Sequence, residues 1–131
     1  MIEFRLDARS GVATYLQIVQ QVEEALRLGT LGVGDQLPTV REAVAELAIN
    51  PNTVARAYRE LERAGLVVAR QGRGTFVARG LASASLQHHE ELRRRLEEWL
   101  ADADAAGLDD ESVKALVSAT LRERLGHPRA A

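Results

Sequence analysis

Four polar or basic side chains able to bind nucleic acid recur at helical spacing in the middle of the chain. In a helix from Pro51 to about Ala64, at about 100° per residue, these side chains would share one face: Asn52, Arg56, Arg59 and Arg63. The opposite face would carry apolar side chains: Val54, Ala57, Tyr58, Leu61 and Ala64. In the DNA major groove arginine binds guanine, asparagine binds adenine, and additional arginines neutralise phosphates. The pattern favours a DNA-binding helix over the alternative, a solvated arginine surface.

The positive charge of the chain is concentrated in the same region. The whole chain of 131 residues has a net charge of −2. Residues 41–80 carry seven arginines and four acidic residues, whereas residues 1–40 and 81–131 are each net acidic. Because phosphate binding requires basic groups on one face rather than a basic total, the negative net charge does not exclude DNA binding.

A second candidate for DNA contact is a glycine-rich turn. Residues 66–69 and 75–78 have the composition of two short strands, and the sequence Arg70-Gln71-Gly72-Arg73-Gly74 joins them. Glycines at the tip would let the backbone approach the sugar-phosphate chain, and Arg73 could enter the minor groove. The alternative for both glycines is an ordinary tight hairpin turn, which needs them with or without DNA.

The helices that would position these side chains have recognisable starts and stops. A stripe of apolar residues from Thr14 predicts a first helix, with Thr14 and Gln17 spaced as a capping box and Gly29 as its stop. Thr39 can cap a short second helix, and Asn50 followed by Pro51 is a strong start signal for the third. Residues 2–6 alternate apolar and charged side chains, which is typical of a short strand or of an extended arm on an apolar surface.

A short helix, a three-residue turn and a longer helix, preceded by another helix and followed by a hairpin, form a winged helix-turn-helix. Four segments in this order resemble the GntR family of bacterial repressors. They are Asp35-Gln36-Leu37-Pro38-Thr39-Val40-Arg41-Glu42, Asn50-Pro51-Asn52-Thr53-Val54, Arg56-Ala57-Tyr58-Arg59-Glu60-Leu61-Glu62 and Gly72-Arg73-Gly74-Thr75-Phe76-Val77. The resemblance covers residues 4 to 79. Ala13 and Val33 stand where the family often has proline, and Ala48 where it often has glycine.

The resemblance implies roles for individual residues. Arg41 would contact a phosphate or a guanine, with an exposed position beside Glu42 as the alternative, and Asn52, Thr53 and Arg56 would face the major groove with help from Arg59. The complete set of residues that we predict to bind DNA is Arg41, Asn50, Asn52, Thr53, Arg56, Arg59, Gln71, Gly72, Arg73 and Gly74. Within the family, the chain resembles the YtrA subfamily, which has a small two-helix dimerisation region.

Residues 80–85 are small and polar enough to form a hinge. We therefore predict two domains, a winged helix-turn-helix over residues 1–80 and a helical dimerisation tail over residues 81–131, in a fold of the α+β class that is mainly α. Two amphipathic helices of this size cannot bury their apolar faces alone, so they would pack either on the first domain or on a second copy of the tail, and self-association is the preferred interpretation. The residues predicted to form a dimer interface are Leu92, Leu96, Trp99, Leu100, Val113, Leu116, Val117 and Leu121.

The composition argues against several other classes of protein. The chain has no cysteine, and its N-terminus lacks the apolar stretch of a secretion signal, so we expect a soluble cytoplasmic protein without disulfides and without membrane association. His88 and His89 are adjacent and would point apart on a helix, which argues against a metal site. No grouping of nucleophile and base and no phosphate-binding loop is present. We predict neither an enzyme nor a cofactor.

The function that we predict is a homodimeric repressor bound to double-stranded DNA at an inverted-repeat operator. The resemblance implies that the target is its own operon, often together with ABC transporter genes. One alternative is a winged-helix module that binds proteins instead of DNA. Another is a regulator whose small-molecule effector, of unknown identity, binds between the tail helices or at the hinge.

Overall fold

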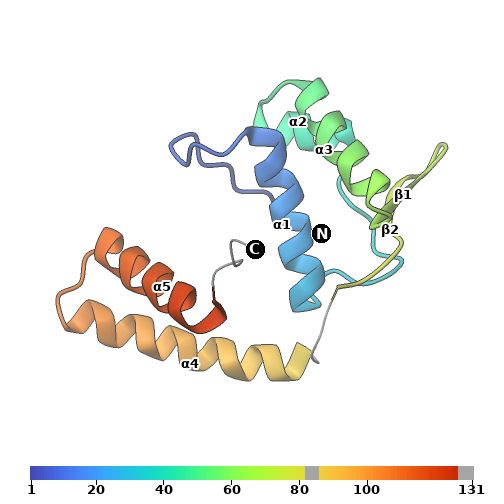
Figure 1. The fold of residues 1–131 in the computed structure, drawn as a ribbon. Coiled ribbons are helices and arrows are strands. Elements are labelled where there is room, and N and C mark those ends of the chain that lie inside the picture. Colours follow the sequence, from blue (N-terminus) through green and yellow to red (C-terminus); the bar gives the residue numbers. More distant parts are fainter. Residues whose placement is uncertain (82–85, 127–131) are drawn as a thin grey trace. The chain divides into compact units, whose positions relative to one another are not determined.

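The computed structural model of the chain describes residues 1–81 and 86–126. The chain divides into two compact units, Met1–Leu86 and Gln87–Ala131. Three helices and a hairpin form the first unit, and two helices form the second (Figure 1). The domain limits expected from the sequence remain a prediction, because the expected hinge includes residues 82–85, which lie outside the described residues.

The core of the first unit lies between α1 (Thr14–Leu28) and α3 (Pro51–Arg63). The inward faces of the two helices contribute Ile18, Val22, Leu26, Val54, Ala57 and Leu61, all at most 1% exposed. Leu37, from the segment before α2 (Val40–Leu47), is also fully buried. Each large apolar side chain buried in this way contributes about 1.5–3 kcal/mol to folding. The core therefore fixes α3 with its apolar face inward and its arginine face outward.

The N-terminal segment is an extended arm rather than a strand, and it lies along α1 (Figure 1). The Gln21 side chain accepts from the Arg5 backbone N–H at 2.8 Å and donates to its carbonyl at 2.7 Å, and Gln17 makes the same pair of bonds with Asp7 at 2.8 and 2.9 Å. The predicted capping box at Thr14 and Gln17 is wrong, because Ala13 is the N-cap residue and no side chain caps α1. The glutamine is used to hold the arm instead.

The second and third helices begin where their capping residues predict. Thr39 accepts from the Glu42 backbone N–H, and the Glu42 carboxylate accepts from the Thr39 N–H, each at 3.0 Å. The Asn50 side chain accepts from the Asn52 N–H at 2.8 Å. Between the helices, Ala48 has φ 53° and ψ 45°, a left-handed conformation that disfavours side chains with a β-carbon. The turn from α2 into α3 is therefore built at some cost in backbone strain.

The hairpin consists of β1 (Val67–Arg70) and β2 (Gly74–Val77), paired antiparallel with Val67 opposite Val77 and Arg70 opposite Gly74. The strands expected at residues 66–69 and 75–78 are both shifted by one residue toward the turn because Arg70 pairs with Gly74. The segment before α2 pairs with the other edge of β2, because Leu37 N–H donates to the Thr75 carbonyl at 2.9 Å and Val77 N–H donates to the Asp35 carbonyl at 2.8 Å. The hairpin is thus attached to the helix-turn-helix through its second strand.

The second unit is a hairpin of two helices, α4 (Leu86–Ala105) and α5 (Asp110–Leu125) (Figure 1). The Asp109 carboxylate caps α5 by accepting from the Ser112 N–H at 2.8 Å, and this bond holds the pKa of Asp109 below its usual range. Ala103 is buried near the end of α4, whereas α5 contains no buried residue. None of the helices within residues 1–81 and 86–126 combines the length and apolar character needed to span a bilayer.

Candidate nucleic-acid interface

The outer face of α3 carries the polar side chains that the helical spacing predicts. Asn52, Arg56, Arg59 and Arg63 are all exposed, and the opposite face buries Val54, Ala57, Tyr58 and Leu61. Ala64, expected on the buried face, is exposed because α3 ends at Arg63 and Ala64 is its C-cap. Arg63 donates to the Glu60 carboxylate, so part of its donor capacity is used within the helix. Asn52 and Arg59 project from the same face. The surface offers amide and guanidinium donors on one side of a single helix, which is the form that enters a major groove.

The guanidinium of Arg56 lies over the aromatic ring of Tyr15, with 3.8 Å between its central carbon and the ring centroid. Tyr15 belongs to the first turn of α1, so this cation–π contact joins α3 to α1 at the protein surface. The sequence pattern places Tyr15 only in the apolar stripe of α1. No local signal indicates the contact, because it depends on how two separate helices pack.

Asn50 and Thr53 flank this face at the start of α3. The Asn50 side-chain oxygen caps the helix, which leaves its amide nitrogen as a donor. Thr53 is half-buried, so less of its surface is open to a partner than at Asn52. Asn50 therefore has an established structural role beside the predicted role in DNA binding.

Tyr58 connects α3 to the segment before α2. Its hydroxyl donates to the Pro38 carbonyl at 2.6 Å inside the protein. Burial, and secondarily the negative charge of Glu42, raise the pKa of Tyr58 well above its usual value, so the hydroxyl remains protonated and donating. This bond fixes the position of α2 against α3 and, with it, the direction of Arg41 from the first turn of α2.

Arg41 is exposed at the second position of α2. A cation in the first turn of a helix opposes the positive end of the helix dipole, so Arg41 does not stabilise α2. A bound phosphate would reverse that balance, because both the arginine and the free amides of the first turn attract an anion. The position therefore suits an anion contact better than a purely structural role.

The turn of the hairpin is closed by a hydrogen bond from Arg73 N–H to the Arg70 carbonyl at 2.9 Å. Gly72 has φ +73° at the third position of this turn, where a residue with a β-carbon is strained. Gly74 has φ +116°, and a β-carbon there would lie 2.7 Å from the side-chain nitrogen of Gln36. The structure of the hairpin thus explains why glycine occupies both positions, and their contact with DNA stays a prediction.

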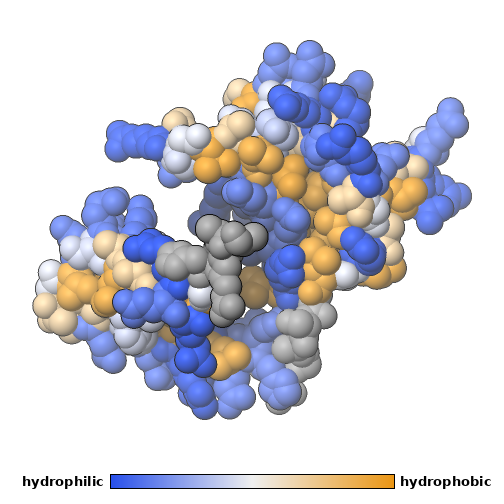
Figure 2. Space-filling model, in the orientation of Figure 1, coloured by the Kyte–Doolittle hydropathy of each residue, from blue (hydrophilic) through white to orange (hydrophobic). Residues whose placement is uncertain are grey.

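Gln36 holds the turn of the hairpin, and sequence patterns do not assign it to the DNA-binding residues. Its side-chain amide donates to the Arg73 carbonyl at 3.0 Å. The contact fixes the backbone from which the exposed Arg73 side chain extends. Figure 2 shows that the projecting tip of the hairpin is covered by hydrophilic side chains. The basic tip, which contains Gln71 and Arg73, is therefore an exposed and anchored surface.

The predicted dimer residues are open to solvent in the single chain. Leu92, Leu96, Trp99 and Leu100 of α4 are 38% to 57% exposed, although they follow an apolar stripe with helical spacing. On α5, Leu116 and Leu121 are exposed and Val113 and Val117 are half-buried. Figure 2 shows hydrophobic surface between charged side chains on this unit. Exposed apolar side chains of this kind are candidates for contact with another protein surface.

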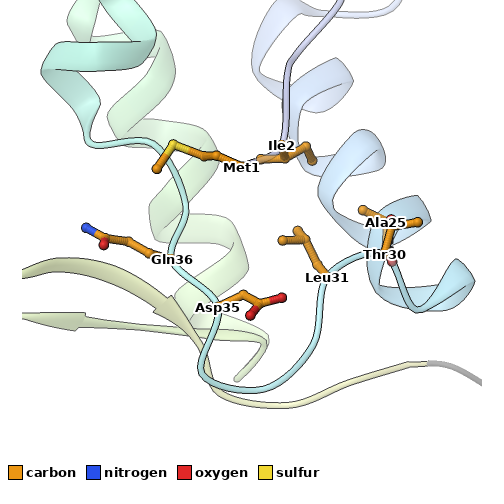
Figure 3. A pocket seen from close by; sticks show the side chains of 7 residues that line it. All are labelled: Met1, Ile2, Ala25, Thr30, Leu31, Asp35 and Gln36. Carbon is orange, nitrogen blue, oxygen red and sulfur yellow. Dashed lines mark hydrogen bonds between the residues drawn. The ribbon is translucent and has the colours of Figure 1, made fainter.

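A cavity of about 460 Å³ lies in the first unit, between the N-terminal arm, the end of α1 and the segment before α2 (Figure 3). Three polar side chains line it, and each already makes a hydrogen bond to backbone: Thr30 to the Ala25 carbonyl, Asp35 to the Gly32 N–H and Gln36 to the Arg73 carbonyl. The remaining lining is apolar. Since these polar groups bind the chain itself, the cavity does not present the convergent polar groups of a ligand site.

Within the described residues, no cluster of three or more histidine, cysteine, aspartate or glutamate side chains could hold a metal ion. The predicted DNA-binding residues lie on or beside three surfaces: the outer face of α3, the first turn of α2 and the tip of the hairpin. All three belong to the first unit.

Comparison with known proteins identifies relatives of this chain. Residues 14–77 match the family described as bacterial regulatory proteins, gntR family. The HTH-type transcriptional repressor YtrA of Bacillus subtilis (strain 168) is 36% identical over 110 residues, which are 83% of this chain and 85% of that protein. This similarity is longer than the first unit and so extends into the tail.

Two solved structures are similar over most of their length. YtrA from Sulfolobus acidocaldarius, a GntR-family transcription factor, is 33% identical, and the match covers 75% of this chain and 97% of that one with a TM-score of 0.52. A structure named as a transcriptional antiterminator from Listeria monocytogenes EGD-e is 30% identical, with coverages of 99% and 98% and a TM-score of 0.58.

Proposed function

This chain belongs to the GntR family of bacterial DNA-binding transcriptional regulators, and we propose that it is a homodimeric repressor of the YtrA type. Each protomer places α3 in the major groove of one half of an inverted-repeat operator. Phosphate contacts supply most of the affinity, and base contacts supply the sequence preference.

The exposed amide and guanidinium face of α3, opposite the buried side chains of Val54, Ala57, Tyr58 and Leu61, is the observation that supports this function. Asn52 and Arg59 take the role of base readers on that face. Arg41 binds a phosphate from the start of α2, where the helix N-terminus also favours an anion. Arg73 reaches the minor groove from the anchored tip of the hairpin.

The apolar stripe of α4 and the apolar residues of α5 supply the dimer contact. A second copy of the same chain is the occupant that we assign to this surface, because an inverted repeat requires two copies related by a twofold axis. Leu92, Leu96 and Trp99, at 57%, 53% and 38% exposure, are large apolar side chains of α4 that the second copy would cover. Two half-sites separated by about one helical turn, about 34–36 Å, follow from this arrangement.

We also assign the repressor to the cytoplasm, where its DNA is, and to its own operon, with transporter genes as further targets. Similarity to a repressor over most of both chains supports repression rather than activation. Membership of a family of DNA-binding regulators favours DNA over a protein partner. An effector site between the tail helices stays an alternative within the same function.

Selection of duplexes from a random DNA pool by the purified protein, at two salt concentrations, tests the function. We expect an inverted repeat to be enriched, binding to weaken at the higher salt, and the solution mass of the unbound protein to be that of a dimer. Absence of enrichment together with absence of salt dependence would instead favour the protein-binding alternative.

A further inference from the structure

The contact between Arg56 and Tyr15 leaves the DNA-binding atoms of the arginine available. The central carbon of the guanidinium lies over the ring, 3.8 Å from its centroid, which is a distance at which a guanidinium stacks on an aromatic face. Its five N–H donors point outward in the guanidinium plane and are not consumed by such a contact. Stacking therefore restricts the side chain without occupying its hydrogen-bonding edge.

The acidic residue best spaced to capture Arg56 is bound elsewhere. Glu60 lies one helical turn after Arg56, the spacing at which glutamate and arginine pair. In the structure the Glu60 carboxylate binds Arg63 instead, and within residues 1–81 and 86–126 no ion pair includes Arg56. Arg63 and Arg56 therefore differ in kind, since Arg63 is paired with a carboxylate and Arg56 is held by an aromatic ring.

The direction of the contact places Arg56 at one flank of the outer face of α3. Tyr58, toward one side of the helix, reaches the segment before α2, whereas Arg56, toward the other side, reaches α1. Asn52 and Arg59 lie between these flanks at about 100° per residue. When a helix enters the major groove, its central face meets base edges and its flanks approach the phosphates that border the groove.

We propose that Tyr15 is a positioning residue that holds the Arg56 guanidinium at the α1 flank of α3, where it binds a DNA phosphate rather than a base. Arg56 thus contributes affinity that does not depend on sequence, and Tyr15 acts on DNA only through Arg56. The inference rests on the proposed DNA-binding function and adds a residue that sequence patterns do not assign to it.

Four variants of the full chain test this role: Tyr15→Phe, Tyr15→Leu, Arg56→Lys and Tyr15→Leu combined with Arg56→Lys. Affinity is measured by fluorescence anisotropy for an enriched duplex and for a duplex of unrelated sequence, across a series of salt concentrations. Circular dichroism monitors the folded state. Arg56→Lys is included because it keeps the charge at an exposed position but removes the planar guanidinium, which stacks on rings and can donate two hydrogen bonds to one phosphate.

We expect Tyr15→Phe to keep affinity within about twofold, because the ring face remains. Tyr15→Leu and Arg56→Lys each lower DNA affinity by about two- to fivefold. For each variant the factor is the same on both duplexes. The combined variant binds DNA as tightly as Arg56→Lys alone. The change at Tyr15 then has no effect once the stacking guanidinium is gone.

Three results would overturn the assignment while leaving DNA binding intact. The first is unchanged affinity in folded Arg56→Lys protein. The second is a loss confined to the enriched duplex, which would make Arg56 a base reader. The third is a Tyr15→Leu loss that persists in the Arg56→Lys background or that Tyr15→Phe reproduces, which would make Tyr15 a structural residue. Failure of the unmodified protein to bind either duplex would overturn the proposed function itself, and the role of Tyr15 with it.

Discussion

The side-chain amide of Gln36 donates a hydrogen bond to the backbone carbonyl of Arg73, 37 residues later in the chain, at 3.0 Å. Gly74 leaves room for this contact, because a β-carbon at that position would lie 2.7 Å from the same nitrogen. The hairpin is thereby tied to the segment that leads into the helix-turn-helix. Its basic tip has a defined direction for contact with DNA.

Gly74→Ala is expected to lower stability and DNA affinity together. The φ of +116° strains any residue with a β-carbon, and the added methyl displaces Gln36, for a total cost of about 1–3 kcal/mol in the free energy of unfolding. Urea denaturation gives the stability, and anisotropy gives the affinity. Gly11→Ala, at φ +75° with open space around it, is the matched control and should affect stability alone. Equal effects of both variants on DNA affinity would contradict the anchoring role of Gln36.

Replacing Ala48 with glycine should stabilise the protein. Ala48 has a left-handed backbone, which costs an alanine about 1–2 kcal/mol, whereas glycine adopts it freely at the cost of a more flexible unfolded chain. Ala45→Gly is the control, since Ala45 is an equally exposed alanine with helical backbone in α2 and its replacement should destabilise by about 1 kcal/mol. Opposite signs for the two variants in urea denaturation are expected. Destabilisation by Ala48→Gly as large as that of Ala45→Gly would mean that the turn is not strained.

Trp99→Ala is expected to shift the protein from dimer to monomer without unfolding the winged unit. The side chain lies in the exposed apolar stripe of α4, and aromatic anchors commonly dominate such interfaces. Sedimentation velocity measures the shift, and circular dichroism follows the fold. Glu98→Ala changes an exposed neighbour off this stripe and should leave the mass unchanged. If the Trp99→Ala protein remained dimeric, the apolar stripe of α4 would not form the proposed interface.

Stability should fall in acid partly through Glu42. Backbone and side-chain hydrogen bonds with Thr39 hold the pKa of Glu42 below its usual value of 4.5. A carboxyl group with a depressed pKa in the folded state contributes stability that is present above the unfolded-state value and is lost as the pH falls through the folded-state value. Glu42→Gln should therefore reduce the decline in melting temperature as the pH falls below 4.5. If melting temperature depended on pH in the same way in both proteins, ionisation of Glu42 would contribute nothing to the stability of the folded state.

Local signals in the sequence predicted the start of two helices but not the contacts between distant segments. Thr39 and Asn50 cap α2 and α3 as expected, because a cap needs only residues two or three positions away. The spacing of Thr14 and Gln17 predicts a capping box instead, but Gln17 binds the arm ten residues earlier, at Asp7. An amide side chain suits either role, and only tertiary packing selects between them.

The same distinction applies to the candidate DNA surface. The arginine face of α3 follows from helical periodicity, which is why Arg56, Arg59 and Asn52 could be placed on it from the sequence. Periodicity gives no information about the Tyr15 ring that contacts Arg56 or about the Gln36 side chain that holds the hairpin. Tyr15 and Gln36 lie in other elements, so their contacts exist only after α1, α3 and the hairpin have packed.

The most direct test of sequence-specific DNA binding through α3 is the affinity of unmodified protein and of Asn52→Ala combined with Arg59→Ala, for the enriched duplex and a scrambled one. The unmodified protein should bind the enriched duplex at least about 10³-fold more tightly, and the substitutions should remove most of that ratio, at about 1–3 kcal/mol for each side chain. Glu62→Ala, on the same helix, should preserve the ratio. A ratio near one for the unmodified protein, or a ratio unaffected by the two substitutions, would contradict α3 as the element that reads DNA.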